Sequence, residues 1–508
     1  MTTSQASTPG TVYLVGAGPG DPGLITVRGV ECLQAADVVL YDYLVNPAIV
    51  EHANPEAEIV SLGRPRTGRS MSQDDIIARM IEEAREGRCV VRLKGGDPSV
   101  FGRGSEEADA LRDAGIPYEI VPGITTGLAV AAYTEIPITH RDDASAVALI
   151  AGRERDDREG SALDYQALAA FPGTLIFYMG VKRAGEWSEA LIEHGKPPET
   201  PVGVIRWCTR THQETYRCTL DTVVETVDAN SIQPPSVFVV GEVVRRAPDL
   251  SWFSERPLFG TRILVPSSLA TGERLRHRLR ALGADVLLRP VLLARDPEDW
   301  APLDAALDDL DSYDWLVFTS GNGVDYLLKR IAERGEDLRR LGGLKIAVVG
   351  QGTAERLATF GIRADRMPEE FNSEGLARVL VDEAEGKRFL VARTTRGRQV
   401  LAPALERAGG EVHQVVAYES VDVKDPDPEV AELLAKGEID WIVVTSSATA
   451  RALHDLYGED LGSARLASIS PLTSGDLREI GLEPTVEASP ATVDGVVDAI
   501  LSSHRQGA

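Results

Sequence analysis

Residues 89–104 read CVVRLKGGDPSVFGRG, a short apolar run that ends in two glycines and an aspartate. Such a run predicts a buried strand followed by a ligand-binding turn, because glycine lets the backbone approach a ligand closely. Asp97 can accept hydrogen bonds from hydroxyl or ammonium groups. Two further turns follow predicted strands in the same half, VPGITT (121–126) and FYMG (177–180). We expect the three turns to form one cleft at the carboxyl edge of parallel sheets.

The same succession of strand, turn and helix continues along the whole chain. Helices are predicted at 24–36, 73–86 and 273–282. Strands are predicted at 11–16, 37–41, 89–94, 147–151, 174–178, 202–206 and 236–241, and then at 261–266, 286–292, 314–319, 344–350, 388–392, 412–418 and 440–445. This alternation predicts an α/β fold with largely parallel sheets.

A stretch near residue 250 with two prolines and no clear periodicity marks a domain boundary. We expect a disordered tail (1–10), a first two-lobed domain (11–246, with a break near 130–145), a linker (247–257) and a second domain (258–505). The second domain contains an internal echo, because DWLVFTSGNG (314–323) resembles DWIVVTSSAT (440–449). Two similar α/β lobes explain this echo, and chance repetition of a common strand–turn–helix is the alternative.

Composition limits the class of protein. The 508 residues are 43% apolar and 26% charged, which fits several buried cores and excludes a disordered chain or a coiled coil. No apolar run reaches the roughly 18 residues of a membrane span, and the first ten residues carry no secretory signal. The net charge of −25 argues against nucleic-acid binding. The four cysteines form no CxxC pair, and no HExxH occurs, so we expect no metal site and a cytoplasmic location.

The turn GAGPGD (16–21) also follows a strand and resembles a dinucleotide fingerprint, with Asp42 as the acidic residue about 20 positions on. However, Asp21 replaces the third glycine, and Pro19 has no amide to offer a pyrophosphate. A carboxylate at the entrance of the helix would also repel a phosphate. The turn therefore suits a ligand without phosphates better than a nicotinamide dinucleotide.

Residues 11 to about 255 resemble the uroporphyrinogen-III C-methyltransferases of the tetrapyrrole methylase family. The runs that carry this resemblance occur in the family's order: VGAGPGDPGLIT, ADVVLYDYLV, VVRLKGGDPSVFGRGSEE, VPGITT, IPITHR and YMG. The resemblance implies two α/β lobes with S-adenosylmethionine between them, S-adenosylhomocysteine as product and no metal. It also favours a homodimer through this half.

The family pattern, carried over residue by residue, implies roles for individual positions. It places on the cofactor Pro19, Gly95, Gly96, Asp97, Val100, Thr125, Thr126, Met179 and Cys208. It makes Asp42 a general base, with a helix cap or strand-end hydrogen bond as the alternative, and it gives Arg103 a catalytic role on the substrate side. The family's usual lysine is here Arg64, and arginine does not readily release a proton. Substrate carboxylates are therefore expected on Arg64, Arg66 and Arg141, with Arg103 as a further anion partner.

The second half resembles uroporphyrinogen-III synthase, through the runs RPLFGTRILV, FTSGNGV, IAVVGQGTAERL, SEGLA, VAYES and DWIVVTSSAT. Ser470 departs from the family, which usually has glycine before this proline. The resemblance implies one lobe from 258–292 plus 419–505 and an inserted lobe from 293–418. It also implies the closure of linear hydroxymethylbilane with inversion of its last ring. Hydroxyls at strand ends are the expected substrate contacts: Thr319, Ser320, Thr353, Thr445 and Ser446.

Together the two resemblances predict a bifunctional enzyme. It would make uroporphyrinogen III and methylate it twice to precorrin-2, on the branch towards sirohaem and cobalamin. The partners would be small tetrapyrroles, without nucleic acid or membrane. Two alternatives remain open: a catalytically silent C-terminal binding module, and a nicotinamide-dependent oxidoreductase in the first half.

Overall fold

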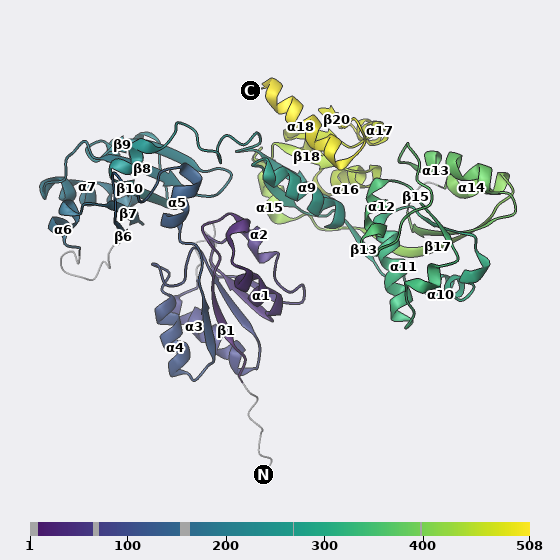
Figure 1. The fold of residues 1–508 in the computed structure, drawn as a ribbon, viewed down its shortest axis with the longest axis horizontal. Helices are drawn as coiled ribbons and strands as arrows, with labels where there is room; N and C mark the ends of the chain where they lie inside the picture. Colours follow the sequence, from purple (N-terminus) through teal and green to yellow (C-terminus); the bar gives the residue numbers. More distant parts are fainter. Residues whose placement is uncertain (1–8, 64–70, 153–162, 268, 397–398, 508) are drawn as a thin grey trace, which may run out of the picture. The chain divides into compact units, whose positions relative to one another are not determined.

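The structure is a computed structural model that describes residues 9–63, 71–152, 163–267, 269–396 and 399–507 (Figure 1). The chain divides into two compact units, Met1–Gly260 and Thr261–Ala508. Within the described residues, each unit contains two five-stranded sheets with helices packed against them. The α/β class with largely parallel sheets is thereby confirmed.

The first sheet of the first unit is entirely parallel, in the order β3-β2-β4-β1-β5. Its strands are β1 (Val12–Gly16), β2 (Val38–Tyr41), β3 (Glu58–Ser61), β4 (Val90–Lys94) and β5 (Tyr118–Val121). Helices α3 (Gln73–Arg85) and α4 (Gly104–Asp113) pack on one face, and α1 (Val27–Ala35) and α2 (Pro47–Val50) pack on the other. Because the strands are parallel, their carboxyl ends share one edge.

The second sheet is mixed, in the order β6-β7-β10-β8-β9, and departs from the expected parallel pattern. Its strands are β6 (Val147–Ala151), β7 (Thr174–Tyr178), β8 (Pro201–Arg206), β9 (Glu214–Thr219) and β10 (Ser236–Val240). β6 and β7 are parallel, whereas β10 runs antiparallel to both β7 and β8, and β9 to β8. Exposure alternates along most of β9, as is typical of an antiparallel edge strand with one wet face. The helices of this lobe are α5 (Thr126–Thr134), α6 (Tyr165–Ala170), α7 (Ala184–Glu193) and α8 (Val223–Ala229).

Residues 247–257, expected as a linker and here called the joint, pack on the first unit. Ser251 and Phe253 are buried, and the aromatic side chains of Phe253 and Tyr133 meet edge-on, with centroids 4.6 Å apart. Arg256 lies over the Trp252 ring, 4.5 Å from its centroid. The joint therefore contributes to the core of the first unit.

The second unit is built from two lobes with parallel-rich sheets. The sheet of the first lobe has the strand order β12-β11-β18-β19-β20. Its strands are β11 (Arg262–Val265), β12 (Asp285–Leu288), β18 (Trp441–Val444), β19 (Arg465–Ser468) and β20 (Val486–Glu487). The sheet of the inserted lobe has the order β13-β17-β16-β14-β15, with strands β13 (Leu292–Arg295), β14 (Trp315–Phe318), β15 (Lys345–Val348), β16 (Arg388–Thr394) and β17 (Glu411–Asp422). β13 is antiparallel to β17, and every other pairing of these two sheets is parallel.

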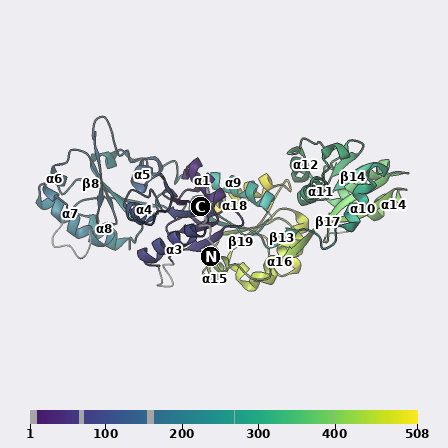
Figure 2. The same cartoon turned by 90° about the horizontal axis from the view of Figure 1, so that it is seen from below.

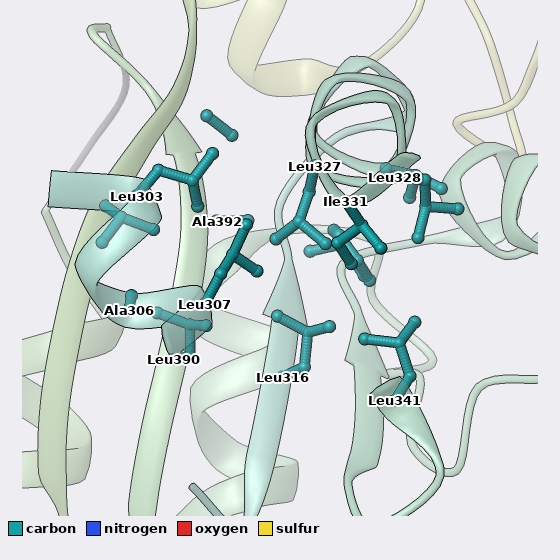
Figure 3. Close-up of a cluster of buried hydrophobic side chains, with 14 of the residues drawn as sticks. Leu303, Ala306, Leu307, Leu316, Leu327, Leu328, Ile331, Leu341, Leu390 and Ala392 are labelled. Atoms are coloured by element: carbon teal, nitrogen blue, oxygen red, sulfur yellow. The ribbon is translucent and has the colours of Figure 1, made fainter. Parts of the chain in front are cut away.

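Helices cover both sheets of the second unit. Those of the first lobe are α9 (Leu269–Ala281), α15 (Pro428–Ala435), α16 (Ser447–Tyr457), α17 (Pro471–Glu479) and α18 (Val493–Gly507). Those of the inserted lobe are α10 (Ala301–Asp308), α11 (Gly321–Glu333), α12 (Gln351–Ala358), α13 (Ser373–Leu380) and α14 (Leu401–Arg407), several of which surround β14 and β17 in Figure 2. In the inserted core, leucines of α10 and α11 pack against Leu316 and Leu390 of the sheet (Figure 3).

The predicted strand 286–292 is two strands in two different sheets. β12 ends at Leu288 and β13 begins at Leu292, and Pro290 lies between them. Proline has no amide hydrogen to donate to either ladder, and neither strand includes it. The chain crosses at this point from one lobe to the other.

The internal echo corresponds to two strands with the same local contacts. Asp314 accepts a hydrogen bond from the Arg388 amide at 2.9 Å, and Asp440 accepts one from the Arg262 amide at 2.7 Å. The tryptophan after each aspartate is covered by a cation from the next strand: Lys345 lies over Trp315, and Arg465 lies over Trp441. Equivalent contacts in both lobes favour two copies of one α/β design over chance repetition.

We predict that Asp314→Ala and Asp440→Ala each destabilise the second unit by about 0.5–1.5 kcal/mol, because each removes the hydrogen bond between the aspartate and a strand amide. Urea unfolding followed by tryptophan fluorescence measures the change. The control is Asp311→Ala, whose side chain is 87% exposed. A midpoint for Asp440→Ala equal to that of the control would contradict this role.

Candidate active sites

Three turns meet at the carboxyl edge of the first sheet. Gly18 and Gly96 exchange two backbone hydrogen bonds, of 3.1 and 2.8 Å. A β-carbon on Gly123 would lie 2.2 Å from the Gly96 carbonyl oxygen, and one on Gly16 would lie 2.5 Å from the Gly123 α-carbon. Only glycine fits at such distances. The turns after β1, β4 and β5 are thus packed backbone against backbone.

Asp97 ties two of these turns together. Its carboxylate accepts a hydrogen bond from the Gly123 amide at 2.9 Å and one from the Ser99 amide at 2.7 Å. The residue expected to contact the cofactor therefore also holds the turns that surround it. Gly96, with φ +71°, has open space on its outer side, where a β-carbon would meet only the Thr125 α-carbon, at 3.8 Å.

A hydroxyl pair joins this edge to the second sheet. Thr125 is buried, and its Oγ1 lies 2.8 Å from the Tyr178 hydroxyl, which also accepts a hydrogen bond from the Gly127 amide at 2.6 Å. Thr126 is the first residue of α5. The Tyr178 ring contacts Phe101 of the 95–104 turn, with centroids 5.1 Å apart. The turn after β7 therefore lies beside the turn after β4.

The remaining expected cofactor contacts differ in accessibility. Met179 is 49% exposed and has a left-handed backbone (φ 57°), while Pro19, Gly95 and Val100 are half-buried. Cys208 is buried in the core, and burial raises the pKa of its thiol. Its neighbours Trp207 and Thr209 both have positive φ, which is unusual for residues with side chains. A ligand near Cys208 would therefore meet the backbone of this turn.

Asp42 follows β2 and belongs to a network of charges. Its Oδ1 accepts a hydrogen bond from Nη2 of Arg92 at 2.6 Å. Glu107 pairs with both Arg92, at 3.1 Å, and Lys94, at 2.9 Å. Burial lowers the pKa of the Lys94 ammonium, and the nearby Arg92 lowers it further. Glu107 also accepts a hydrogen bond from the Gln73 side-chain amide (Nε2) at 2.9 Å, so one buried carboxylate serves three donors.

Sequence reasoning missed Arg92, Lys94 and Glu107 as parts of this site. A signal was available, because Arg92 and Lys94 alternate with apolar residues in a strand predicted to be buried. Buried cations need partners. Because Arg92 and Lys94 are two residues apart in one strand, their side chains face the same side of the sheet. Nothing in the local pattern identified Glu107 of α4 as the common partner.

The expected substrate arginines lie in different places. Arg103 is exposed, pairs with Glu106 at 2.6 Å and has a left-handed backbone (φ 58°) at the start of α4. Arg141 is exposed beside Asp142 and Asp143, which line the same shallow pocket. In the described part of the chain, no contact joins Arg141 to Asp42. Arg64 and Arg66 lie outside the described residues.

In the second unit, the expected hydroxyls occupy strand–helix junctions. Ser320 caps α11 by accepting the Gly323 amide at 3.0 Å, and Ser446 caps α16 by accepting the Thr449 amide at 3.1 Å. Thr353 is buried in the first turn of α12. The Thr319 hydroxyl lies 3.4 Å from the Ala392 carbonyl.

Two partners of these hydroxyls were not predicted. The Tyr418 hydroxyl lies 3.1 Å from Ser320 Oγ, and Ser267 Oγ lies 2.7 Å from Thr445 Oγ1. Tyr418 belongs to β17, and its ring stacks on Tyr326 of α11, with centroids 5.5 Å apart. Sequence spacing cannot show such pairs, because 98 and 178 residues separate their members.

Comparison with known proteins gives the family of each half. The model described as "Tetrapyrrole (Corrin/Porphyrin) Methylases" matches residues 11–224, and the model described as "Uroporphyrinogen-III synthase HemD" matches residues 273–498. The "Porphyrin biosynthesis protein HemD" of Ruminiclostridium josui is 32% identical over 494 residues, which cover 97% of this chain and 98% of that protein. The chain belongs to both families, as a fusion of a tetrapyrrole methylase and a uroporphyrinogen-III synthase.

Other relatives match the methylase half. The "S-adenosyl-L-methionine-dependent uroporphyrinogen III methyltransferase" of Methanosarcina barkeri is 44% identical over 46% of this chain and 92% of its own length. A solved structure of uroporphyrin-III C-methyltransferase from Thermus thermophilus, complexed with S-adenosylhomocysteine, is 38% identical. It covers 46% of this chain and 99% of that chain, with a TM-score of 0.40.

Two further properties concern the described residues. None of their helices has both the length and the apolar character required to cross a membrane. No group of three or more His, Cys, Asp or Glu side chains is arranged to hold a metal ion there.

We predict that Glu107→Gln destabilises the methylase half by about 3 kcal/mol, because it leaves two buried cations without their shared countercharge. Calorimetric unfolding of the full chain measures this. Glu106→Gln is the matched control, since this neighbour forms an exposed pair with Arg103 and we expect a change below about 0.5 kcal/mol. Equal melting curves for the two variants would show that the network contributes little.

Proposed function

We propose that this fusion makes uroporphyrinogen III in its synthase half and methylates it twice in its methylase half, giving precorrin-2. One observation carries the proposal for the methylase half. The open side of Gly96 lies at the same sheet edge as Asp42, whose carboxylate is held by Arg92. A ligand-binding turn and a fixed carboxylate at one edge are what a methyl transfer with proton removal requires.

The residues around Gly96 fit S-adenosylmethionine. Gly96 leaves its backbone accessible, and Met179, whose side chain carries a thioether, is 49% exposed. Pro19 occurs in the adjoining turn, so this edge suits a ligand that does not need a full set of amide donors for phosphates. We assign the cofactor to Pro19, Gly95, Gly96, Asp97, Val100, Thr125, Thr126, Met179 and the backbone near Cys208. When bound, the cofactor supplies an electrophilic methyl group.

Asp42 is proposed to take the proton that the tetrapyrrole must lose. Arg92 occupies its Oδ1, and among the described residues its Oδ2 has no hydrogen-bond partner. One oxygen is thus oriented by the protein while the other can accept a proton. We propose Arg64, Arg66, Arg103 and Arg141 as partners for the substrate's carboxylates, with Arg103 nearest to the cofactor turn in sequence.

The synthase half is proposed to act by shaping its substrate. Its strand–helix junctions present Thr319, Ser320, Thr353, Thr445 and Ser446. Hydroxyls at such junctions bind carboxylates by hydrogen bonding and favour one ring closure over the spontaneous one. One observation supports the alternative of a silent binding module, because Ser320 and Ser446 already cap helices.

Cellular context follows from this proposal. Fusion would raise the local concentration of the shared intermediate. The product would enter the sirohaem or cobalamin branch, and the enzyme would work in the cytoplasm. We also propose a homodimer through the methylase half, as expected from its resemblance to the uroporphyrinogen-III C-methyltransferases.

The overall activity is tested with hydroxymethylbilane as substrate. Without S-adenosylmethionine, the wild type should convert this substrate to uroporphyrinogen III. With S-adenosylmethionine, it should give a dimethylated product. Asp42→Asn should slow methylation by about 10²–10⁴-fold, as expected for loss of a general base, while still producing uroporphyrinogen III. Asp113→Asn, at the exposed end of α4, is the control.

Each outcome of this assay distinguishes one part of the proposal. If only the spontaneous isomer forms, the synthase half is a silent module. Unchanged methylation by Asp42→Asn would exclude Asp42 as the base.

Cofactor choice has its own test. We expect S-adenosylhomocysteine at about 100 times its dissociation constant to stabilise the chain by about 2.7 kcal/mol, because a ligand of the native state shifts the unfolding equilibrium. NAD at the same concentration should leave the melting temperature unchanged. The reverse result in a thermal-shift assay would favour the oxidoreductase alternative.

A further inference from the structure

Helix α5 begins and ends at functionally different places. Its first residue, Thr126, and the preceding Thr125 are proposed cofactor contacts. The amide of Gly127, in the same first turn, donates to the Tyr178 hydroxyl. Any displacement of this nine-residue helix would therefore move the cofactor turn at its start.

The C-terminal end of α5 is held by the joint. Carbonyl groups in the last turn of a helix have no partner within the helix. Here the Ala132 carbonyl accepts a hydrogen bond from the Trp252 indole at 2.6 Å. The Tyr133 carbonyl accepts one from the Ser251 hydroxyl at 2.8 Å and one from the Gln213 side-chain amide (Nε2) at 3.3 Å. Segments distant in sequence thus complete the end of this helix.

Tyr133 also belongs to a closed ring of four hydrogen bonds. Its hydroxyl donates to Oδ2 of Asp21 at 2.7 Å, and the Asp21 amide donates to Thr209 Oγ1 at 2.9 Å. The Thr209 amide donates to Oε1 of Gln213 at 2.8 Å, and the Gln213 side-chain amide donates to the Tyr133 carbonyl, which closes the circuit. Tyr133, Thr209 and Gln213 are each less than 10% exposed. We call this hydrogen-bonded circuit of Tyr133, Asp21, Thr209 and Gln213 the Tyr133 ring, as distinct from the phenol ring of Tyr133 itself.

The Tyr133 ring reaches the cofactor turn through Asp21. This residue directly follows Gly18-Pro19-Gly20, and Gly18 is paired with Gly96 through two backbone hydrogen bonds. Burial raises the pKa of the Tyr133 hydroxyl, and its bond to Asp21 raises it further, so the hydroxyl remains a donor across the neutral range. Asp21 thus connects the parallel sheet to α5 and to the turn after β8.

We infer that Tyr133 is a positioning residue for the methyl donor, through which the joint and the Tyr133 ring set the geometry of both cofactor turns. The joint reaches the donor site through α5, in addition to linking the two halves. This inference rests on the proposed function for its ligand. The hydrogen bonds of the Tyr133 ring are present in the protein without any ligand.

The direct test uses hydrogen–deuterium exchange of the full chain without any ligand. In Tyr133→Phe, peptides covering residues 17–24 and 207–213 should exchange faster than in the wild type, because the ring is open. Tyr118→Phe is the matched control, since the Tyr118 hydroxyl accepts from Arg112 at 2.6 Å on the exposed surface of the same unit. Unchanged exchange in these two segments would overturn the ring as a constraint.

The second test measures the consequence for the donor. Tyr133→Phe should raise the KM for S-adenosylmethionine and the Kd for S-adenosylhomocysteine by about tenfold, as expected when the half-buried Asp21 carboxylate loses its donor, with kcat within about twofold. Ser251→Ala in the joint should also raise this KM and this Kd, and Tyr118→Phe should leave both unchanged.

The failure of each idea has a separate signature. A Tyr133→Phe variant that melts earlier yet binds S-adenosylhomocysteine as the wild type does would make the ring merely structural. A wild type that does not bind S-adenosylhomocysteine would overturn the proposed function, while the exchange measurement would still decide whether the ring exists.

Discussion

The backbone contact between Gly16, Gly96 and Gly123 is the constraint on which the methylase half depends. A carbonyl oxygen occupies the position where a side chain on Gly123 would begin, at 2.2 Å. Interiors are packed too densely to yield at such distances, so three turns from three strands are locked as one surface. Asp97 reinforces the contact through the Gly123 amide. The open side of Gly96 then has a shape that does not depend on any flexible side chain.

A second requirement is electrical. Placing Arg92 and Lys94 inside a sheet costs several kcal/mol per ion unless a countercharge is present, and Glu107 supplies it from the neighbouring helix. The arrangement has a use beyond neutralisation, since Arg92 ends at the carboxylate of Asp42. The orientation of the proposed base is thereby tied to the core of the sheet. A surface arginine, free to change rotamer, would hold it less firmly.

The synthase half is organised differently, by repetition of one design. Asp314 and Asp440 receive equivalent strand amides, and Ser320 and Ser446 cap equivalent helices with nearly the same backbone angles. In both cases the serine oxygen satisfies a backbone amide in the first turn of the helix, which is what an N-cap requires. The site proposed for the methylase half lies at one sheet edge, whereas the hydroxyls proposed for the synthase half lie at several similar strand–helix junctions.

The sequence alone determined the α/β class, most central strands, the glycine turns and the two family resemblances, because apolar periodicity and turn residues act over a few positions. It placed one strand across Pro290 and did not reveal β9, whose pattern is largely polar. Only the tertiary structure decided who pairs with whom: Glu107 with Arg92 and Lys94, Ser320 with Tyr418, and Asp21 with Tyr133, 112 residues along the chain. Such pairs are set by packing of whole elements, and no local spacing encodes them.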